Sequence, residues 1–430
     1  MRNLPVIALI LLSSGRLIAQ STVDKIINPT AVESVEKVLS ADDMRGRAIF
    51  SPEIEKAADY ISAQFKEAGL QTLKGSNSYR QTFSLVKTKL ISVTGVFDSN
   101  PLPEGSVAIF SPDAEVRMNE VSGYQKHIIK AGDNFGPSVM QILANRDTNK
   151  LVLIDTSFSK SFPRLIRFSE RQNKPAKNVI FVLTALNPEH YSIEAKQDAQ
   201  ESPLANVVGI LPGKSKKNEF VIFSSHYDHL GVGKPDSKGD SIYNGANDDA
   251  SGSTAVILLA KYFGKLKNNE RTLVFVTFTG EESGGLGSNY FSHQFDPSTV
   301  MAMFNIEMIG TESKWGTNSA YLTGYEKSDM GKILQKNLQG SPFTFYPDPY
   351  PDQQLFYRSD NATLARQGVP AHTISTSKMD SEKYYHTPGD EISTLDMNNM
   401  AQIIRSIALS SQTIVAGKDT PSRVDATQLH

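Results

Sequence analysis

Three apolar runs in the second half of the chain most constrain how it can fold. Nearly continuous apolar side chains occupy Glu219–Ser225, Thr272–Thr279 and Ala302–Ile309. Runs of this kind predict strands that are buried on both faces, as in the central sheet of an α/β protein. A helical period over Ser251–Phe263 separates the first run from the second. Because strands and a helix alternate, the sequence predicts an α/β layered fold.

Polar clusters stand at the ends of these runs, in positions where a solvated loop has no need of them. They are His226 with Asp228, Asp248 with Asp249, and Glu281 with Glu282. A further acid, Glu307, lies inside the third run, where burial of an unpaired carboxylate costs several kcal/mol. Rigid strands hold ligands in place while the loops that follow give access, so the pattern indicates a metal site.

Composition narrows the chemistry of that site. The chain of 430 residues has no cysteine, so disulfides and thiolate ligands are excluded, and a zinc ion must be held by histidines and carboxylates. Its formal net charge of -2 gives no electrostatic case for nucleic acid or an anionic membrane as a partner. The proportions of 39% hydrophobic and 21% charged residues indicate a globular protein.

Each candidate ligand, taken alone, has a simpler explanation. A histidine at a strand end, such as His226, is more often only hydrogen-bonded, and Asp248 is placed to cap the helix that follows it. Glu281 and Glu282 could be a solvated turn, and His386 an ordinary loop residue. As a set, however, two histidines with four or five carboxylates match the ligands of two zinc ions. Two metals about 3.5–4 Å apart need one bridging carboxylate and two terminal ligands each.

The order of these motifs resembles a known family. HxD, GANDDASG, GEE, NxE and a late YHTPGDE follow one another as in the zinc-dependent exopeptidases, the family of bacterial leucyl-type aminopeptidases and glutamate carboxypeptidase. The resemblance extends from about Asn206 to Ala408. It implies an α/β fold of the phosphorylase/hydrolase-like type, with a mixed central sheet between helices and two catalytic zinc ions.

The resemblance also implies a metal role for individual residues. His226 and Glu307 are similar to ligands of the first zinc, Asp248 to the bridging carboxylate, and Glu282 and His386 to ligands of the second zinc. Glu307 stands where the family usually has Asp, and its extra methylene changes the reach of the carboxylate.

Four further residues resemble the catalytic surroundings of the family's metals. Glu281 is similar to the general base, and Asp228 to the carboxylate that orients the first histidine. Asn361 follows Ser359 and Asp360 where the family usually has a histidine that donates to substrate. Tyr385 is similar to a tyrosine that donates to the oxyanion in some members.

The rest of the chain supplies the expected domain boundaries. Residues 1–20 resemble a secretory signal peptide, with Arg2 before an apolar run, which predicts a periplasmic or secreted protein; a buried N-terminal helix is the alternative. Residues 21–82 are expected to be the N-terminal part of the peptidase domain. Residues 83–201 are expected to form a β-rich insertion or small domain, residues 202–415 the di-zinc core, and residues 416–430 a tail.

The resulting hypothesis is a secreted di-zinc metallo-exopeptidase that acts on peptides, with an aminopeptidase favoured and a carboxypeptidase left open. A glutaminyl-cyclase-like acyltransferase with one zinc is the first alternative, and it usually lacks the sequence Ala250-Ser251-Gly252. An inactive, metal-stabilised binding module is the second, and the presence of Glu281 argues against it. The sequence carries no indication of the oligomeric state.

Overall fold

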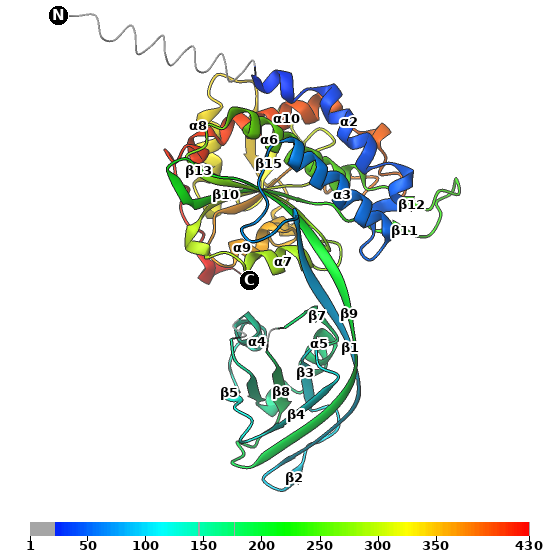
Figure 1. Cartoon of the computed structure of the whole chain (residues 1–430), viewed down its shortest axis with the longest axis vertical. Coiled ribbons are helices and arrows are strands. Elements are labelled where there is room, and N and C mark those ends of the chain that lie inside the picture. Colours follow the sequence, from blue (N-terminus) through cyan, green and yellow to red (C-terminus); the bar gives the residue numbers. More distant parts are fainter. Residues whose placement is uncertain (1–21, 145–146, 176, 430) are drawn as a thin grey trace, which may run out of the picture. The chain divides into compact units, whose positions relative to one another are not determined.

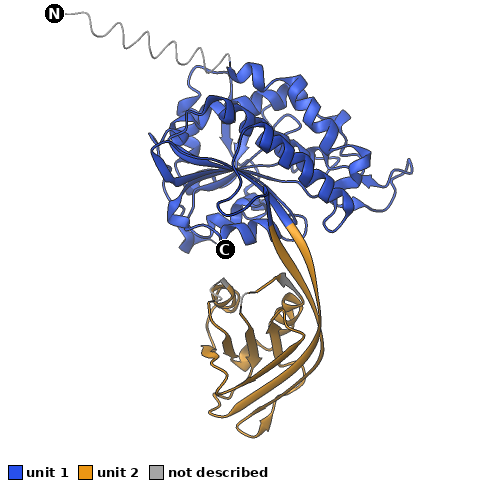
Figure 2. Cartoon of the chain, viewed as in Figure 1, with its two compact units in different colours: residues 1–81, 205–430 blue, residues 82–204 orange. Residues whose placement is uncertain are grey.

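The computed structural model describes residues 22–144, 147–175 and 177–429 (Figure 1). The predicted signal peptide at residues 1–20 therefore lies outside the described residues. By internal contacts the chain forms two compact units, residues 1–81 with 205–430 and residues 82–204 (Figure 2). Within the described ranges, no helix combines the length and the apolar character that crossing a membrane requires.

The first unit is built on a mixed sheet whose central strands are parallel. In order across the sheet, its strands are β16 (Thr344–Pro347), β15 (Ser319–Leu322), β17 (Ala371–Ser375), β14 (Val300–Ile306), β10 (Lys216–His226), β13 (Arg271–Phe278) and β9 (Tyr191–Leu211). β10 pairs in parallel with both β13 and β14, and β14 pairs in parallel with β17. β9 and β15 join this core in the antiparallel sense. The predicted α/β fold with a mixed central sheet is confirmed.

Helices cover both faces of this sheet (Figure 1). They are α2 (Pro29–Leu39), α3 (Pro52–Glu67), α6 (Ser251–Leu266), α7 (Leu286–Ser292), α8 (Met330–Asn337), α9 (Asn361–Ala365), α10 (Met397–Ser410) and α11 (Gln412–Val415). Side chains of α2, α3, α6, α8 and α10 belong to the larger apolar cluster on one face. Side chains of α7 and α9 belong to a second cluster on the other face. The sheet is therefore buried on both sides, as its continuous apolar runs predict.

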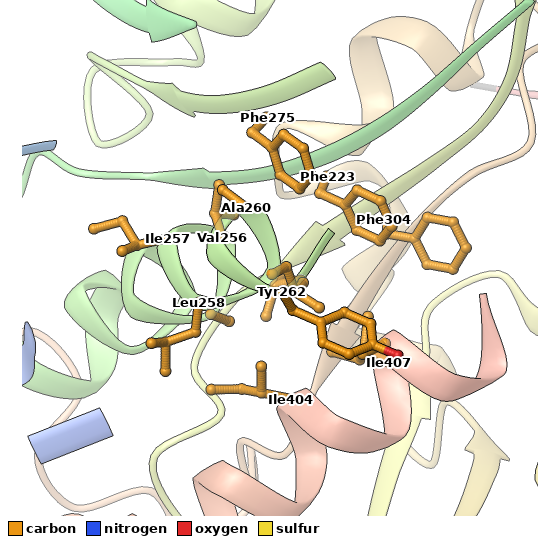
Figure 3. Close-up of a cluster of buried hydrophobic side chains, with 14 of the residues drawn as sticks. Phe223, Val256, Ile257, Leu258, Ala260, Tyr262, Phe275, Phe304, Ile404 and Ile407 are labelled. Atoms are coloured by element: carbon orange, nitrogen blue, oxygen red, sulfur yellow. The ribbon is translucent and has the colours of Figure 1, made fainter. Parts of the chain in front are cut away.

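Alternation along the strands assigns side chains to the two faces. Phe223 lies in the larger cluster and stacks on Phe275 and Phe304, with ring centroids 5.5 and 4.9 Å apart (Figure 3). Its neighbour Ile222 lies in the second cluster. Aromatic pairs at these distances stabilise a core beyond the burial of their area. This stack joins the three parallel strands on the face of the sheet that α6 covers.

The second unit contains its own four-stranded sheet. In order, these strands are β3 (Val107–Phe110), β8 (Val179–Leu183), β6 (Lys150–Ile154) and β5 (Gln125–Ile129). Four other strands of residues 80–173, β1 (Arg80–Phe97), β2 (Asn100–Pro101), β4 (Glu115–Asn119) and β7 (Arg171–Asn173), pair with one another or with β9. The unit also contains helices α4 (Phe135–Ala144) and α5 (Phe162–Ser169), which the sequence analysis did not predict. Apolar side chains of both helices pack on the four-stranded sheet, so this unit has a core of its own.

Candidate metal centre

The parallel strands bring the predicted site residues to one edge of the sheet. His226 is the last residue of β10, and Glu307 directly follows β14. Glu281 and Glu282 follow β13 after Gly280, whose φ of 74° is a left-handed conformation that favours glycine. Because parallel strands end at a common edge, residues 25 to 81 positions apart in the chain meet there.

Asp248 lies between two groups of candidate ligands. It belongs to the helical turn η3 (Ala246–Ala250) that precedes α6. Its Oδ1 lies 3.2 Å from Nε2 of His226, and its Oδ2 lies 3.3 Å from Nε2 of His386. A carboxylate with one oxygen toward each of two histidines has the arrangement that bridging two metals requires.

We call the two groups the first and the second metal position. In the first, ligand atoms of His226, Asp248 and Glu307 all lie within 4.8 Å of one another. In the second, Nε2 of His386 lies 3.2 Å from Oε2 of Glu282, and Asp248 is shared. The structure therefore brings together all five predicted ligand residues. The nitrogen and carboxylate oxygen donors, without thiolate, suit zinc.

A third histidine, which the sequence analysis missed, belongs to the same cluster. Nδ1 of His229 lies 2.8 Å from Oε1 of Glu282 and 3.9 Å from Oδ2 of Asp248. Its side chain is fully buried. His229 follows His226 by three residues in the same strand-end loop, HYDHLG, and this short spacing is the signal that could have identified it.

The imidazoles and carboxylates of the cluster shift one another's pKa values. Burial would raise the pKa of Asp248, but the close imidazoles of His226 and His386 hold it well below its usual range. Burial acts to lower the pKa of His386, but the close carboxylates of Asp248 and Glu282 raise it to about 10. In the absence of a cation, protons on the histidines compensate the carboxylates. A divalent cation supplies the same compensation and displaces those protons.

Buried ligand atoms without hydrogen-bond partners also indicate a cation site. Buried Nε2 of His226, Oε2 of Glu307 and Nε2 of His386 make no hydrogen bond with acceptable geometry to another described residue. Buried polar atoms in folded proteins nearly always have partners. Metal ions at the two positions would provide these partners, so the residues present fit the metal.

Asp228 contacts His226 in a different way from the one predicted. Nδ1 of His226 lies 3.1 Å from the backbone oxygen of Asp228 and 3.8 Å from its carboxylate. The Asp228 carboxylate instead accepts the backbone N–H of Glu281 at 3.2 Å. The carbonyl thus orients the imidazole, and the carboxylate holds the next ligand loop.

Asn361 does not face the metal positions, contrary to the role that the resemblance implies. The residue is fully buried at the start of α9. Its amide nitrogen donates to the carbonyls of Phe356 and Ala371, and its oxygen accepts from Thr373. Both amide hydrogens are used within the fold, so Asn361 has none to donate to a substrate.

Tyr385 does lie beside the centre. Its ring stacks on His386, with centroids 3.8 Å apart. With Glu307, Arg358 and Met379 it lines a cavity of about 50 Å³. Burial raises the pKa of Tyr385 further above its usual value, so its hydroxyl stays protonated and remains a donor.

Arg47 and Asp390 hold the loops that carry the candidate ligands. The buried Arg47, in the turn η1 (Asp42–Arg47), donates to the carbonyls of Tyr227, Asn244 and Gly245 at 2.7–3.0 Å. Asp390 accepts the backbone N–H groups of Asn247 and Asp248 at 2.8 and 3.0 Å. These bonds join the His226 loop, the Asp248 turn and the segment that follows His386.

Comparison with known proteins agrees with this arrangement. Residues 206–410 match the profile described as Peptidase family M28. A protein of Arthroderma otae named "Probable leucine aminopeptidase" is 29% identical over 210 residues, which cover 46% of this chain. The chain spans about half the length of that relative, 53%.

Two solved structures share the fold. One is an aminopeptidase from Aneurinibacillus sp. strain AM-1, with a TM-score of 0.54, 18% identity, and coverage of 95% of this chain and 98% of that one. The other is a zinc aminopeptidase from Bacillus subtilis, with a TM-score of 0.53, 16% identity, and coverage of 90% and 95%. At these identities the likeness is one of fold. Residues 206–410, which carry every candidate ligand, thus form a domain that matches peptidase family M28.

Proposed function

We propose that this protein is a di-zinc aminopeptidase, which removes N-terminal residues from peptides. The observation that carries the proposal is Asp248, whose two carboxylate oxygens face two separate histidines at 3.2 and 3.3 Å. The match of residues 206–410 to peptidase family M28 supports a zinc peptidase, and the printed name of the curated relative supports aminopeptidase activity. The bridging geometry supports two ions rather than one.

In this proposal each metal position has its own ligands. His226 and Glu307 would hold the first zinc, Glu282 and His386 the second, and Asp248 both. Zinc bound there supplies Lewis-acid chemistry, which polarises a peptide carbonyl and makes water a stronger acid at neutral pH.

Glu281 is the candidate general base. It lies outside both groups of candidate ligands, yet its backbone is fixed by Asp228 at the same edge of the sheet. Burial raises its pKa well above the usual range, with carboxylates of Glu307, Asp360 and Asp248 adding to the effect. A carboxylate whose pKa is raised is a stronger base toward water, and once protonated it can deliver that proton to the leaving amine.

Tyr385 is the candidate donor to the developing oxyanion. Its position on the cavity beside Glu307 supports this role, because a substrate carbonyl at the first metal position would lie near that wall. A hydroxyl that remains protonated stabilises negative charge by hydrogen bonding.

Two alternatives are weaker. A single-zinc acyltransferase has no use for a second histidine and carboxylate pair, and this chain has one in His386 and Glu282. A binding module without activity has no use for a buried acid such as Glu281 beside the ligands but outside both groups.

We expect Glu307→Gln to weaken zinc binding at the first position by at least about 10-fold and to leave the second position largely filled. The substitution keeps size but removes the charge of one terminal ligand. Zinc counting by atomic emission after dialysis against a graded chelator measures this. The matched control is Glu326→Gln, at a glutamate whose side chain is 73% exposed. Unchanged stoichiometry and activity in Glu307→Gln would show a buried core acid and no ligand.

Glu281→Gln should retain both zinc ions and near-normal KM, while kcat falls by at least about 10²-fold, because only the basic oxygen is lost. Glu282→Gln should instead lose the second zinc. Steady-state kinetics and zinc content, measured on the same preparations, separate the two effects. Loss of metal in Glu281→Gln, with activity restored by added zinc, would reverse the assignment of these two acids.

The terminal specificity is tested with one peptide in four forms, with each end free or blocked. An aminopeptidase should lose activity when the N-terminus is acetylated and keep it when the C-terminus is amidated. Mass spectrometry of the products reads the result directly. The opposite pattern would indicate a carboxypeptidase. Formation of pyroglutamate from an N-terminal glutamine peptide, without cleavage, would support the acyltransferase.

We also propose export to the periplasm or the outside of the cell, on the sequence of residues 1–20 alone. The protein isolated from its host should then lack the apolar run Leu4–Leu12. Intact-mass measurement decides the matter. A mass that includes Met1 would contradict export by cleavage.

A further inference from the structure

We infer that the cavity beside Glu307 takes the side chain of the substrate's N-terminal residue, and that Arg358 makes this cavity selective for a short acidic side chain. The inference rests on the proposed function, because it names the substrate class of the same site. Neither the family match nor the proposed zinc chemistry fixes a side-chain preference.

The cavity adjoins the first metal position. Its volume is about 50 Å³, and its wall includes Glu307, a candidate ligand of that position, and Tyr385, the candidate donor to the oxyanion. In an aminopeptidase, the carbonyl that reacts and the side chain of the N-terminal residue are attached to the same Cα atom. A substrate whose carbonyl lies at the first metal position, near Tyr385, therefore brings that side chain to the cavity.

The size of the cavity favours a short side chain. A buried water needs roughly 10–15 Å³ measured in this way, so the cavity has room for about four water molecules. A carboxymethyl group, as in aspartate, has four heavy atoms and matches that space. A longer side chain would have to move the wall.

Polar side chains dominate the wall. Side chains alternate between the faces of a strand, and Leu322 of β15 and Ile374 of β17 face the larger apolar cluster. Met308, Leu355 and Met379 are the apolar side chains among the described residues of the wall. Pockets for apolar groups are lined mainly by apolar side chains, so this wall suits a polar group better. The cavity is lined by the hydroxyl-bearing residues Tyr321, Thr323, Ser359, Thr373, Ser375 and Ser377.

Arg358 gives the wall a positive charge. Among the described residues that line the cavity, only Glu307 and Arg358 are charged, and zinc would engage the carboxylate of Glu307. No carboxylate of a described residue lies within 4.0 Å of the Arg358 guanidinium, whose Nη1 is 3.4 Å from Oε1 of Gln353. By contrast, Arg271 pairs with Glu219 at 2.7 Å.

A substrate carboxylate would supply the missing partner. The planar guanidinium can donate two parallel hydrogen bonds to a carboxylate, and it stays charged at any pH at which the protein is folded. The hydroxyl groups of the wall can donate to the same oxygens. An amide of equal size, as in asparagine, has no charge to pair with Arg358, so the two side chains should be distinguished.

The test compares C-terminally amidated tetrapeptides that differ only in the first residue, which is Asp, Asn or Leu. We expect kcat/KM for the Asp peptide to exceed that for the Asn peptide by at least about 10-fold, the usual effect of a hydrogen bond to a charged group. Arg358→Gln should bring this ratio close to one. Arg358→Lys should restore part of it, because it keeps the charge without the planar fork.

The matched control is Arg366→Gln, which should leave the ratio unchanged. Arg366 is an exposed arginine at the end of α9, and it is not part of the wall of the cavity. Three outcomes would overturn the inference. They are equal turnover of the Asp and Asn peptides, a ratio that Arg358→Gln does not alter, and faster cleavage of the Leu peptide than of the Asp peptide.

The source of the carboxylate is tested with the same peptides carrying a free C-terminus. If the free C-terminus alone gives an advantage of about 10-fold, and Arg358→Gln removes it whatever the first residue, the bound carboxylate is the C-terminal one. That result would refute the assignment to the N-terminal side chain.

A binding measurement separates this inference from the proposed function. The zinc-loaded protein is titrated in a calorimeter with the α-amides of L-aspartic acid and L-asparagine, which contain no second residue. Tighter binding of the aspartic acid amide, lost in Arg358→Gln, would support the cavity even in a protein that cleaves no peptide, and only the proposed function would then fail. Equal binding of the two amides to a protein that does cleave peptides would refute the inference alone.

Discussion

The parallel pairing of β10 with β13 and β14 is the constraint on which the rest of this structure depends. It aligns His226 with Phe278 and Ser224 with Asn305, so the three strands end together and the segments beyond them start from one edge. The stacking of Phe223 on Phe275 and Phe304 stabilises that alignment. A slip of one residue in this pairing would turn every side chain of a strand to the opposite face of the sheet, where it would not fit the packed core. The meeting of His226, Glu282 and Glu307 is a consequence of this register.

Burial of the polar groups at the site is unfavourable, and hydrogen bonds with the backbone of the surrounding loops offset this cost. Asp248 and its neighbours leave regular secondary structure at η3, so their N–H groups need partners outside a helix. Asp390 accepts two of these groups, and Arg47 takes three carbonyls from the adjoining loops. A guanidinium is suited to this task because its five donors are planar and it stays charged when buried. The candidate ligands are thus held before any metal arrives.

The buried carboxylates of the cluster connect the fold to the proposed zinc chemistry. The cluster gathers carboxylates at a density that burial makes unfavourable, as the raised pKa of Glu281 and the pKa of about 7 at Glu307 indicate. Two divalent ions would compensate this charge more completely than protons on His226 and His386 can. In the proposed centre Asp248, Glu282 and Glu307 would bind metal, and Glu281 would be the remaining acid of the GEE motif that can exchange a proton.

The sequence by itself determined the mixed α/β fold and the residues that meet at the strand ends, because apolar periodicity and the positions of His226, Asp248, Glu282, Glu307 and His386 are visible along the chain. Tertiary structure alone decided how they are held. The carbonyl of Asp228 lies closer to Nδ1 of His226 than its carboxylate does. Asn361 faces the core because Phe356 and Ala371 offer it carbonyls. Arg47 and Asp390 act on loops up to 198 residues away, and His229 reaches Glu282 across the site. Such contacts depend on side-chain directions between distant segments, which no local pattern records.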